Sequence, residues 1–228
     1  MKRSKINTIM HDADAFFRER SFYLPPFAYW SPEEWVAKGP EVREIVDNGL
    51  GWDITDFGQG DYPNLGLFLF TLRNGTPENL RSKQGKIYAE KIMIVDPNQV
   101  TPMHFHWAKT EDIINRGGGN LVVRLHNATD DGELAQGPVS VSTDGARRTV
   151  SAGDTVVLTP GESITLPPYL YHSFWGTGSR VLVGEVSAVN DDKEDNRFHK
   201  PLGRFPDIEE DEPPLYLLVN DYADYYRR

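Results

Sequence analysis

MHFHWAKTE, at residues 103–111, is the stretch of this 228-residue sequence that decides the fold. Its two histidines, His104 and His106, stand two positions apart in a run that we expect to form a β-strand, so both side chains point to the same face. Two imidazoles on one face can reach one metal ion. Glu111, five residues after His106, can return to the same point from the end of the strand or a turn. The stretch therefore predicts a metal site built on a strand.

A third histidine completes the predicted ligand set. His172 follows the sequence PPYLY and falls on another predicted strand. Three imidazoles and one carboxylate leave room for two water or substrate oxygens in an octahedral shell, and such ligands suit Mn, Fe, Co, Ni or Zn. We therefore predict His104, His106, Glu111 and His172 as metal ligands. The remaining histidines, predicted to be ordinary solvated or hydrogen-bonded side chains, are His11, His126 and His199.

The chain from about residue 50 onward consists of short apolar or alternating runs separated by Gly, Pro, Asn and Asp. Many short strands at this spacing, with no helix between them, predict an antiparallel sandwich or barrel. Asp144-Gly145 predicts a two-residue hairpin turn, and we interpret the glycine run 117–119 as a turn at a strand end. The predicted strands are Leu65–Leu72, Lys86–Val95, Thr101–Trp107, Asn120–Leu125, Val139–Thr143, Arg147–Val150, Thr155–Leu158, Ser163–Leu166 and Arg180–Val186.

Helices are predicted only near the N-terminus. Apolar residues three and four positions apart predict an amphipathic helix from residue 4 to about residue 22. Ser31, Pro32 and Glu34 predict a helix start with a capping box. A shorter helix is expected from Glu41 to Asn48.

We expect one domain over residues 1–228. It divides into a helical N-terminal arm (1–50), a β-barrel core (51–190) and a C-terminal polar loop with a closing strand (191–228). The closing strand is predicted at Leu215–Val219, where apolar residues return after a charged stretch.

The composition excludes several classes of protein. Asp and Glu total 34 against 24 Lys and Arg, and the net charge of -10 argues against nucleic acid or an anionic membrane as a partner. The absence of cysteine excludes disulfides, thiolate zinc sites, iron–sulfur clusters and cysteine nucleophiles. No run of signal-peptide length opens the chain, and no stretch approaches the roughly 18 apolar residues of a membrane span. These features predict a soluble, cytoplasmic protein.

Two half-motifs around the predicted ligands resemble those of the cupin superfamily. The first continues from the His-x-His pair and Glu111 to Gly118, and the second reads Gly161, Pro167 and His172. The second motif departs from the superfamily pattern where Tyr169 replaces Gly and where Gly176 replaces Asn, and neither position is a predicted ligand. The resemblance implies a mainly β fold, an antiparallel β-barrel of the jelly-roll type, here with an N-terminal α-helical extension.

Longer stretches make the sequence similar to the bacterial D-lyxose isomerase family. They are PPFAYW (25–30), SPEEW (31–35), HFHWAKTEDIINRGGGNLVVRL (104–125), LPPYLYHSFWG (166–176) and GEVSAVNDDKEDNRF (184–198), which together span most of the chain. This resemblance implies a metal-dependent aldose–ketose isomerase with Mn²⁺ as the usual metal, or Co²⁺, Fe²⁺ or Zn²⁺ in its place. It also implies conversion of D-lyxose to D-xylulose and of D-mannose to D-fructose, by a homodimer of β-barrel subunits.

That reaction can proceed by a metal-assisted hydride shift, or by loss of a proton from C2 and gain of one at C1 through an enediolate that a divalent metal stabilises. We favour the enediolate route, because the sequence offers a candidate base. Glu185 is our candidate for the base, because alternation along an apolar strand points its charge into the barrel, where a charge needs a partner or a purpose. Lys109 is predicted to polarise a substrate oxygen or to help move a proton. Glu111 is predicted to combine metal binding with catalysis.

Lys91 and Phe174 are the predicted substrate-binding residues. Lys91 interrupts an apolar strand and can contact a hydroxyl, while Phe174 shares the face of His172 and can form a pocket wall. Phe105 and Trp107 alternate with the ligand pair, and we expect them in the outer layer, under the N-terminal arm or at a dimer interface.

Three rival functions stay open at this point. A metal-dependent dioxygenase would use the same ligands with iron and need access for O₂. A non-catalytic sugar-binding cupin would bind without turnover. A phosphosugar isomerase would need a phosphate-binding cluster, for which the glycine run 117–119 beside Arg116 is the candidate.

Overall fold

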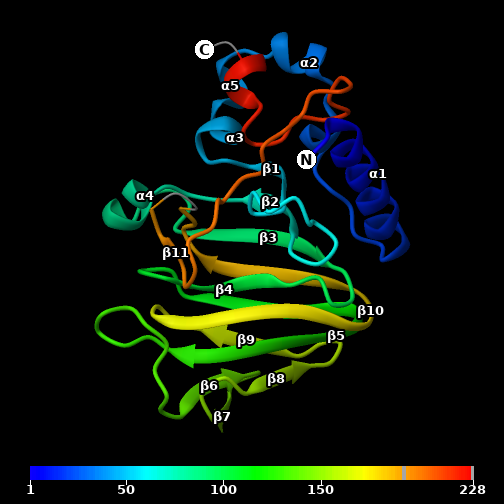
Figure 1. Cartoon of the computed structure of the whole chain (residues 1–228). Helices are drawn as coiled ribbons and strands as arrows, with labels where there is room; N and C mark the ends of the chain where they lie inside the picture. Colours follow the sequence, from blue (N-terminus) through cyan, green and yellow to red (C-terminus); the bar gives the residue numbers. More distant parts are fainter. Residues whose placement is uncertain (192–193, 227–228) are drawn as a thin grey trace.

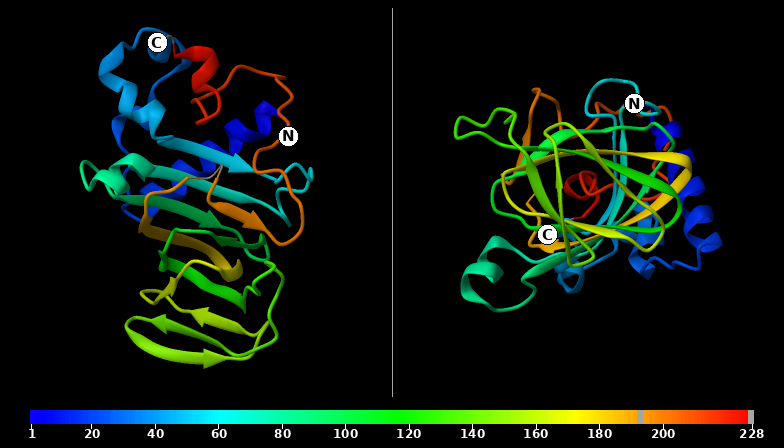
Figure 2. Two further views of the ribbon diagram at one scale, coloured as in Figure 1. Left: turned by 90° about the vertical axis from the view of Figure 1, so that its left-hand side faces the viewer. Right: turned by 90° about the horizontal axis from the view of Figure 1, so that it is seen from below.

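Antiparallel strands close into a barrel in the computed structural model of the chain, which describes residues 1–191 and 194–226 (Figure 1). The strands are β1 (Gly51–Thr55), β2 (Leu67–Arg73), β3 (Tyr88–Val95), β4 (Thr101–His106), β5 (Glu111–Asn127), β6 (Val139–Thr143), β7 (Ala146–Val150), β8 (Thr155–Leu158), β9 (Ser163–Leu166), β10 (Leu170–Ala188) and β11 (Asn196–Phe198). One layer has the order β1-β2-β3-β10-β5-β9-β6-β7, and the other has β11-β4-β10-β5-β8. Seen along its axis in Figure 2, the barrel encloses a common interior. The predicted β-barrel is confirmed.

The long strands β5 and β10 belong to both layers and bend together from one layer into the other. Their register shifts between Thr177 and Val181, opposite the glycine run 117–119. Gly118 has a φ of 102°, and a Cβ there would lie 2.1 Å from the carbonyl oxygen of Arg180. The prediction of a turn here is wrong, because glycine lets a continuous strand bend where a side chain does not fit. The run is part of the sheet and not a free phosphate-binding loop.

Most predicted strands form close to their expected bounds. β6, β8 and β9 match the prediction, and Asp144 and Gly145 both have positive φ, at 50° and 81°, as a type I′ hairpin requires. β1, β11 and the helix α4 (Pro77–Ser82) were not predicted. They are short, and β11 lies in a polar stretch without an apolar pattern.

Alternation along the strands produces two apolar cores on opposite faces of the first layer. The inner core fills the barrel between the layers. Its buried members are Leu69, Met93, Val95, Ile113, Leu121, Val123, Leu125, Val139, Val141, Val156, Leu158, Ile164, Leu166, Leu170, Phe174, Val181 and Val183.

The outer core lies beneath the helix α1 (Arg3–Glu19). Ile6, Met10 and Phe17 on this helix pack on the outward side chains of β1, β2 and β3, among them Trp52 and Phe68. Figure 1 shows α1 beside the upper strands of the barrel. The amphipathic helix predicted from residue 4 onward therefore exists, and it shields one face of the layer from water.

Short helices complete the arm. Ser31 caps α2 (Pro32–Val36): its Oγ accepts a hydrogen bond from the Glu34 N–H (3.2 Å), and its own N–H donates to the Glu34 carboxylate (2.8 Å). The predicted capping box is therefore confirmed. A 3₁₀ turn and α3 (Arg43–Asp47) occupy the expected third helix. Within the described residues, no helix has the length and apolar character to cross a membrane.

The C-terminal segment does not form the predicted closing strand. Leu218 makes one isolated bridge to Trp52, and its own N–H donates to the Asp221 carboxylate (2.8 Å), which starts the turn into α5 (Tyr222–Tyr225). The segment is held instead by Arg3, whose guanidinium contacts Asp221 (2.9 Å) and Glu210 (2.8 Å). Residues 192–193 and 227–228 of the predicted C-terminal segment lie outside the described residues.

We expected Phe105 and Trp107 under the N-terminal arm or at a dimer interface. The first expectation is wrong: neither residue belongs to the outer core beneath the arm. Phe105 is buried in a separate aromatic group with Tyr171, at a ring separation of 4.7 Å, while Trp107 is 40% exposed. The guanidinium of Arg197 lies over the rings of both Phe105 and Trp107. The arm covers the other layer because α1 packs on β1 to β3.

Candidate functional site

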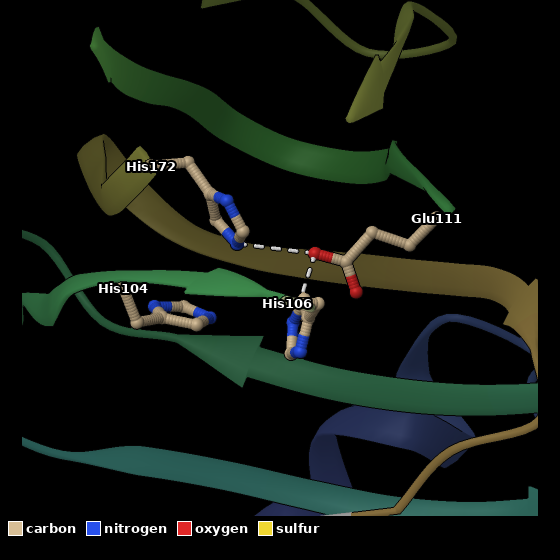
Figure 3. Close-up of side chains that lie close together, drawn as sticks. All are labelled: His104, His106, Glu111 and His172. Carbon is tan, nitrogen blue, oxygen red and sulfur yellow. Dashed lines mark ion pairs between the residues drawn. The ribbon is translucent and has the colours of Figure 1, made fainter. Parts of the chain in front are cut away.

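Three strands bring the four predicted ligands together inside the barrel (Figure 3). His104 and His106 project from one face of β4, His172 lies directly opposite His104 on β10, and Glu111 is the first residue of β5. One ligand atom from each of the four side chains lies within 4.8 Å of the others. All four residues are buried.

The backbone orients all three imidazoles. The Nδ1 atom of His104 lies 2.8 Å from the carbonyl oxygen of Pro102, that of His106 lies 3.0 Å from that of Asp195, and that of His172 lies 3.0 Å from that of Leu170. A carbonyl oxygen only accepts, so each Nδ1 carries the proton and each Nε2 presents a lone pair. Ligand histidines are commonly oriented in this way.

The Nε2 atoms of His106 and His172 converge on one oxygen of Glu111. Its Oε1 lies 3.1 Å from His172 Nε2 and 3.5 Å from His106 Nε2 (Figure 3). His172 Nε2 is buried and has no hydrogen-bond partner among the described residues. An imidazole lone pair facing a carboxylate oxygen at this distance needs a proton or a cation between them. The donor set therefore fits a divalent metal ion.

The protonation states agree with this reading. Burial holds the pKa of His104 well below its usual value, and the neighbouring imidazoles lower it further. Burial and the nearby Lys109 ammonium lower the pKa of His106 as well. Burial by itself would raise the pKa of Glu111, but Lys109 and the histidines outweigh it and hold that pKa well below normal. Neutral imidazoles and an ionised carboxylate are the forms that bind metal.

A buried charge network adjoins the ligand cluster. Lys109 Nζ lies 2.6 Å from Glu111 Oε2 and 2.9 Å from Glu185 Oε1, so one ammonium joins two carboxylates. Burial would lower the pKa of Lys109, but the two carboxylates raise it above its ordinary value. Lys91, directly across from Glu185 in the sheet, lies 3.4 Å from the same Oε1. The predicted catalytic residues and Lys91 thus lie in one network.

Asn190 ties the two lysines together, and sequence reasoning missed it. Its Oδ1 accepts from Lys91 Nζ (2.6 Å) and from Lys109 Nζ (3.2 Å). Asn74 holds the Asn190 backbone from behind, with its Oδ1 accepting the N–H (3.0 Å) and its Nδ2 donating to the carbonyl (2.9 Å). Asn190 lies inside the stretch GEVSAVNDDKEDNRF, but one polar residue at the end of a strand carries no signal of its own.

These groups line a cavity of about 470 Å³ of empty space, part of it open to solvent. Phe174, the predicted pocket wall, lies in it with Lys91, Lys109, Glu111 and Glu185. The lining residues that sequence reasoning did not name are Phe57, Leu67, Leu69, Met93, Thr101, Ile113, Asn196, Phe198 and Arg204. A lining that mixes apolar walls with a few converging charged groups is typical of a small-molecule site.

The polar loop before β11 also contributes. Asp195 accepts backbone hydrogen bonds from Ala108 (2.7 Å) and Lys109 (3.0 Å) through its carboxylate, and its carbonyl orients His106. β11 then pairs with β4 and places Asn196 opposite His106. Charged residues dominate this stretch, so its sequence pattern predicts a loop and not a strand.

The barrel has two layers that share β5 and β10, and a buried His₃–Glu cluster lies beside a charged cavity inside it. This combination defines a cupin-type protein. The family model described as D-lyxose isomerase matches residues 1–222 of the chain. The chain therefore belongs to the D-lyxose isomerase family, and it is an isomerase.

Similar proteins agree in fold and family. The chain is 53% identical to a D-lyxose/D-mannose isomerase of Serratia proteamaculans, with 99% of each chain covered. It is 51% identical to a D-lyxose/D-mannose isomerase of Escherichia coli O157:H7, with 99% of this chain and 100% of that one covered. Among solved structures, a mutant L-ribose isomerase of Acinetobacter sp. DL28 in complex with L-ribose superposes with a TM-score of 0.57 at 15% identity, covering 90% of this chain and 94% of the other. This likeness shows the shared barrel fold.

Proposed function

We propose that this protein interconverts D-lyxose and D-xylulose, and D-mannose and D-fructose, with a divalent metal ion at His104, His106, Glu111 and His172. The observation that carries the proposal is the convergence of three oriented Nε2 atoms and Glu111 beside the buried Glu185–Lys109 pair. The names of the two relatives that are 53% and 51% identical support the choice of sugars.

The metal supplies Lewis acidity at the sugar's carbonyl and neighbouring hydroxyl oxygens. We propose Mn²⁺ as the usual ion, with Co²⁺, Fe²⁺ or Zn²⁺ able to occupy the same imidazole and carboxylate donors. The experiment that tests metal choice is restoration of activity by each ion after chelation.

Two protons change place in the reaction: one moves from C2 to C1, and one moves from the hydroxyl on C2 to the oxygen on C1. Glu185 is the proposed base for the first transfer. Among the described residues, its hydrogen bonds and ion pairs run through Oε1, to Lys109, Lys91 and Ser187. Its Oε2 is therefore available to take the proton from C2 and return it to C1 of the enediol.

Lys109 and Glu111 serve the second transfer in this proposal. The Lys109 ammonium lies between the two carboxylates, where it can donate a hydrogen bond to a sugar oxygen and stabilise negative charge that develops there. Glu111 Oε2 lies 2.6 Å from the Lys109 ammonium and can take part in passing the hydroxyl proton, while Oε1 faces the imidazoles.

Lys91 and Phe174 bind the substrate in this proposal. Lys91 supports Glu185 Oε1 and reaches the same cavity, where its ammonium can donate to a hydroxyl. Phe174, 3% exposed, gives the cavity an apolar wall with Met93 and Leu69. Such walls keep water from the reacting carbons and strengthen the charged contacts inside.

We further propose a homodimer in the cytoplasm. The half-exposed Trp107 and Tyr169 leave an aromatic surface beside the barrel that a second subunit could cover. Sedimentation velocity tests the proposed dimer, and a measured mass equal to that of one chain would contradict it. Fractionation of producing cells with an antibody against the chain tests the location.

The test of the function is ketose formation by protein that has been stripped with a chelator and then reloaded with Mn²⁺. D-lyxose, D-mannose and a phosphorylated aldose serve as substrates. We expect the two free sugars to react only after reloading, and the phosphorylated aldose to react poorly. Tight metal binding without turnover of any free sugar would refute the proposed reaction.

A further inference from the structure

The cavity contains buried polar atoms that the proposed mechanism does not use. Within the described part of the chain, the buried side-chain oxygens or nitrogens without a hydrogen-bond partner are Thr101 Oγ1, Asp112 Oδ1, Thr143 Oγ1, His172 Nε2 and Asn196 Oδ1. His172 Nε2 is accounted for by the metal. Thr101 and Asn196 line the same cavity, while Thr143 and Asp112 do not.

Thr101 begins β4 and pairs with Phe174, and a β-bulge separates this pair from the His104–His172 pair. Thr101 lines the cavity although it stands three positions before His104, and it is 2% exposed. The hydrogen bond that Thr101 does accept, from Ser173 Oγ (2.8 Å), goes to its backbone carbonyl and not to its hydroxyl. A buried hydroxyl without a partner costs stability, so its persistence in a cavity needs an explanation.

Asn196 approaches the ligands from the other side. It lies on β11 directly opposite His106, and its buried Oδ1 is an acceptor that finds no donor in the part of the chain that the structure describes. Thr101 and Asn196 thus flank the His104–His106 pair from two strands. An open-chain sugar carries a hydroxyl on every carbon except the carbonyl carbon, and its hydroxyls can satisfy an acceptor and a hydroxyl at the same time.

We propose that the Thr101 hydroxyl and the Asn196 amide oxygen bind substrate hydroxyls, on sugar carbons that do not react. The inference rests on the proposed function, because it assigns these atoms to the sugar that the isomerase converts. It explains why both polar atoms are buried and unpaired in the free protein: their partner arrives with the substrate.

Thr101→Val tests this, with Thr143→Val as the matched control. Valine has the shape of threonine and lacks its hydroxyl, and both hydroxyls are buried and unpaired. Thr143 lies on β6, away from the cavity. Because each substitution removes an unpaired buried group, we expect the Tm of each metal-loaded variant to be unchanged or raised by about 2–4 °C.

Binding and turnover then separate the two variants. With D-arabinitol, the unreactive open-chain alcohol of D-lyxose, as the calorimetric probe, we expect Thr101→Val to bind about 3- to 10-fold more weakly than wild type. The kcat/KM for D-lyxose should fall by a similar factor, chiefly through KM, whereas Thr143→Val should match wild type in both measurements. Asn196→Ala should weaken arabinitol binding in the same direction.

Each outcome decides the point. Unchanged arabinitol affinity and KM in Thr101→Val, with an active wild type, would overturn the inference while the proposed function stands. A fall in Tm in Thr101→Val but not in Thr143→Val would also overturn it, because the hydroxyl would then have a partner in the free protein. A wild type that turns over no sugar but binds arabinitol would refute the proposed function and keep the binding site.

Discussion

The two halves of the barrel interior differ in what the same strand pattern places inside. In the half formed by β6, β8 and β9, the inward residues are mostly apolar, such as Val141, Leu158 and Ile164. In the other half, β3, β4, β10 and the start of β5 place Lys91, three histidines and two carboxylates inside. Alternation decides which side chains face inward, whereas residue type decides whether the interior stabilises the fold or serves chemistry.

The charged half is not simply a cost to the fold, because its charges are paired. Lys109 contacts Glu111 and Glu185, and Lys91 contacts Glu185, which balances two ammonium groups against two carboxylates. Removing one member leaves its partner buried without compensation. The comparison therefore predicts that variants in the apolar half change stability and leave turnover near wild type, whereas variants in the charged half lower turnover as well as stability.

Removal of the metal should have the largest effect. After chelation we expect ketose formation to fall to background, because three imidazole lone pairs and Glu111 Oε1 lose their common ion. Reloading with Mn²⁺ should restore it, and the circular dichroism of the sheet should change little. If metal-free protein formed ketose at the full rate, the claim that the charged half serves metal-dependent chemistry would be contradicted.

Glu185→Gln should lower kcat by about 10²- to 10⁴-fold, the range for loss of a general base. The amide keeps the shape of the side chain but cannot take the proton from C2. Glu90→Gln is the control, because Glu90 is next to Lys91 on β3, its side chain alternates to the other face, and it contacts Arg73. Steady-state kinetics with D-lyxose measures both, and equal kcat in the two variants would remove Glu185 from the reaction.

Leu158→Ala probes the apolar half. Leu158 is fully buried in the inner core, so the cavity left behind should cost about 2–5 kcal/mol of unfolding free energy. Val157→Ala, one position earlier on β8 and 44% exposed, should cost far less. Urea unfolding measures both. The kcat of folded Leu158→Ala should stay near wild type, and a loss of kcat as large as that of Glu185→Gln would show that the halves are not separable.

The smallest effect is expected outside the barrel, at the contact between Arg3 and Glu210. The hydrogen bond from Arg3 lowers the pKa of Glu210 below its ordinary value. A lowered folded-state pKa adds stability above the unfolded pKa, and that contribution is lost as pH falls through the folded value. Because Glu210 is 57% exposed, we expect Glu210→Gln to cost less than about 1 kcal/mol near pH 7. The difference from wild type should shrink in urea unfolding at about pH 3, and a difference that grows there would contradict this sign.

Sequence reasoning found the residues of the site whose type is unusual for their position. Paired histidines on a strand, and Glu185 and Lys91 in apolar runs, stand out because a buried charge or imidazole is rare without a purpose. The structure brings Glu185, Lys91 and Lys109 together with the histidines, while their roles in the reaction stay predictions. Strand alternation was enough to point Glu185 and Lys91 inward, whereas Lys109 lies in the loop between β4 and β5.

The parts that sequence reasoning missed depend on contacts between distant segments. Nothing in the sequence around Asn190 indicates that Asn74 and two lysines will contact it in the fold. Asn196 reaches the site only because β11 pairs with β4. The glycine run 117–119 has the sequence pattern of a turn. Its bend within a continuous strand depends on the close backbone of β10, which the pattern does not show. The segment Leu215–Val219 has the apolar pattern of a strand. The Asp221 carboxylate accepts a hydrogen bond from the Leu218 N–H, so that N–H is not paired with a neighbouring strand.

The most direct test of the central claim is to measure bound Mn²⁺ and ketose formation in the same samples of wild type, His172→Ala and His126→Ala. His126 lies outside the ligand cluster, with its Nδ1 near the carbonyl of Ala135, and serves as the control. We predict about one Mn²⁺ per chain with full turnover in wild type and His126→Ala, and loss of both in His172→Ala. Turnover in His172→Ala without bound metal, or metal bound equally in all three proteins, would contradict the account.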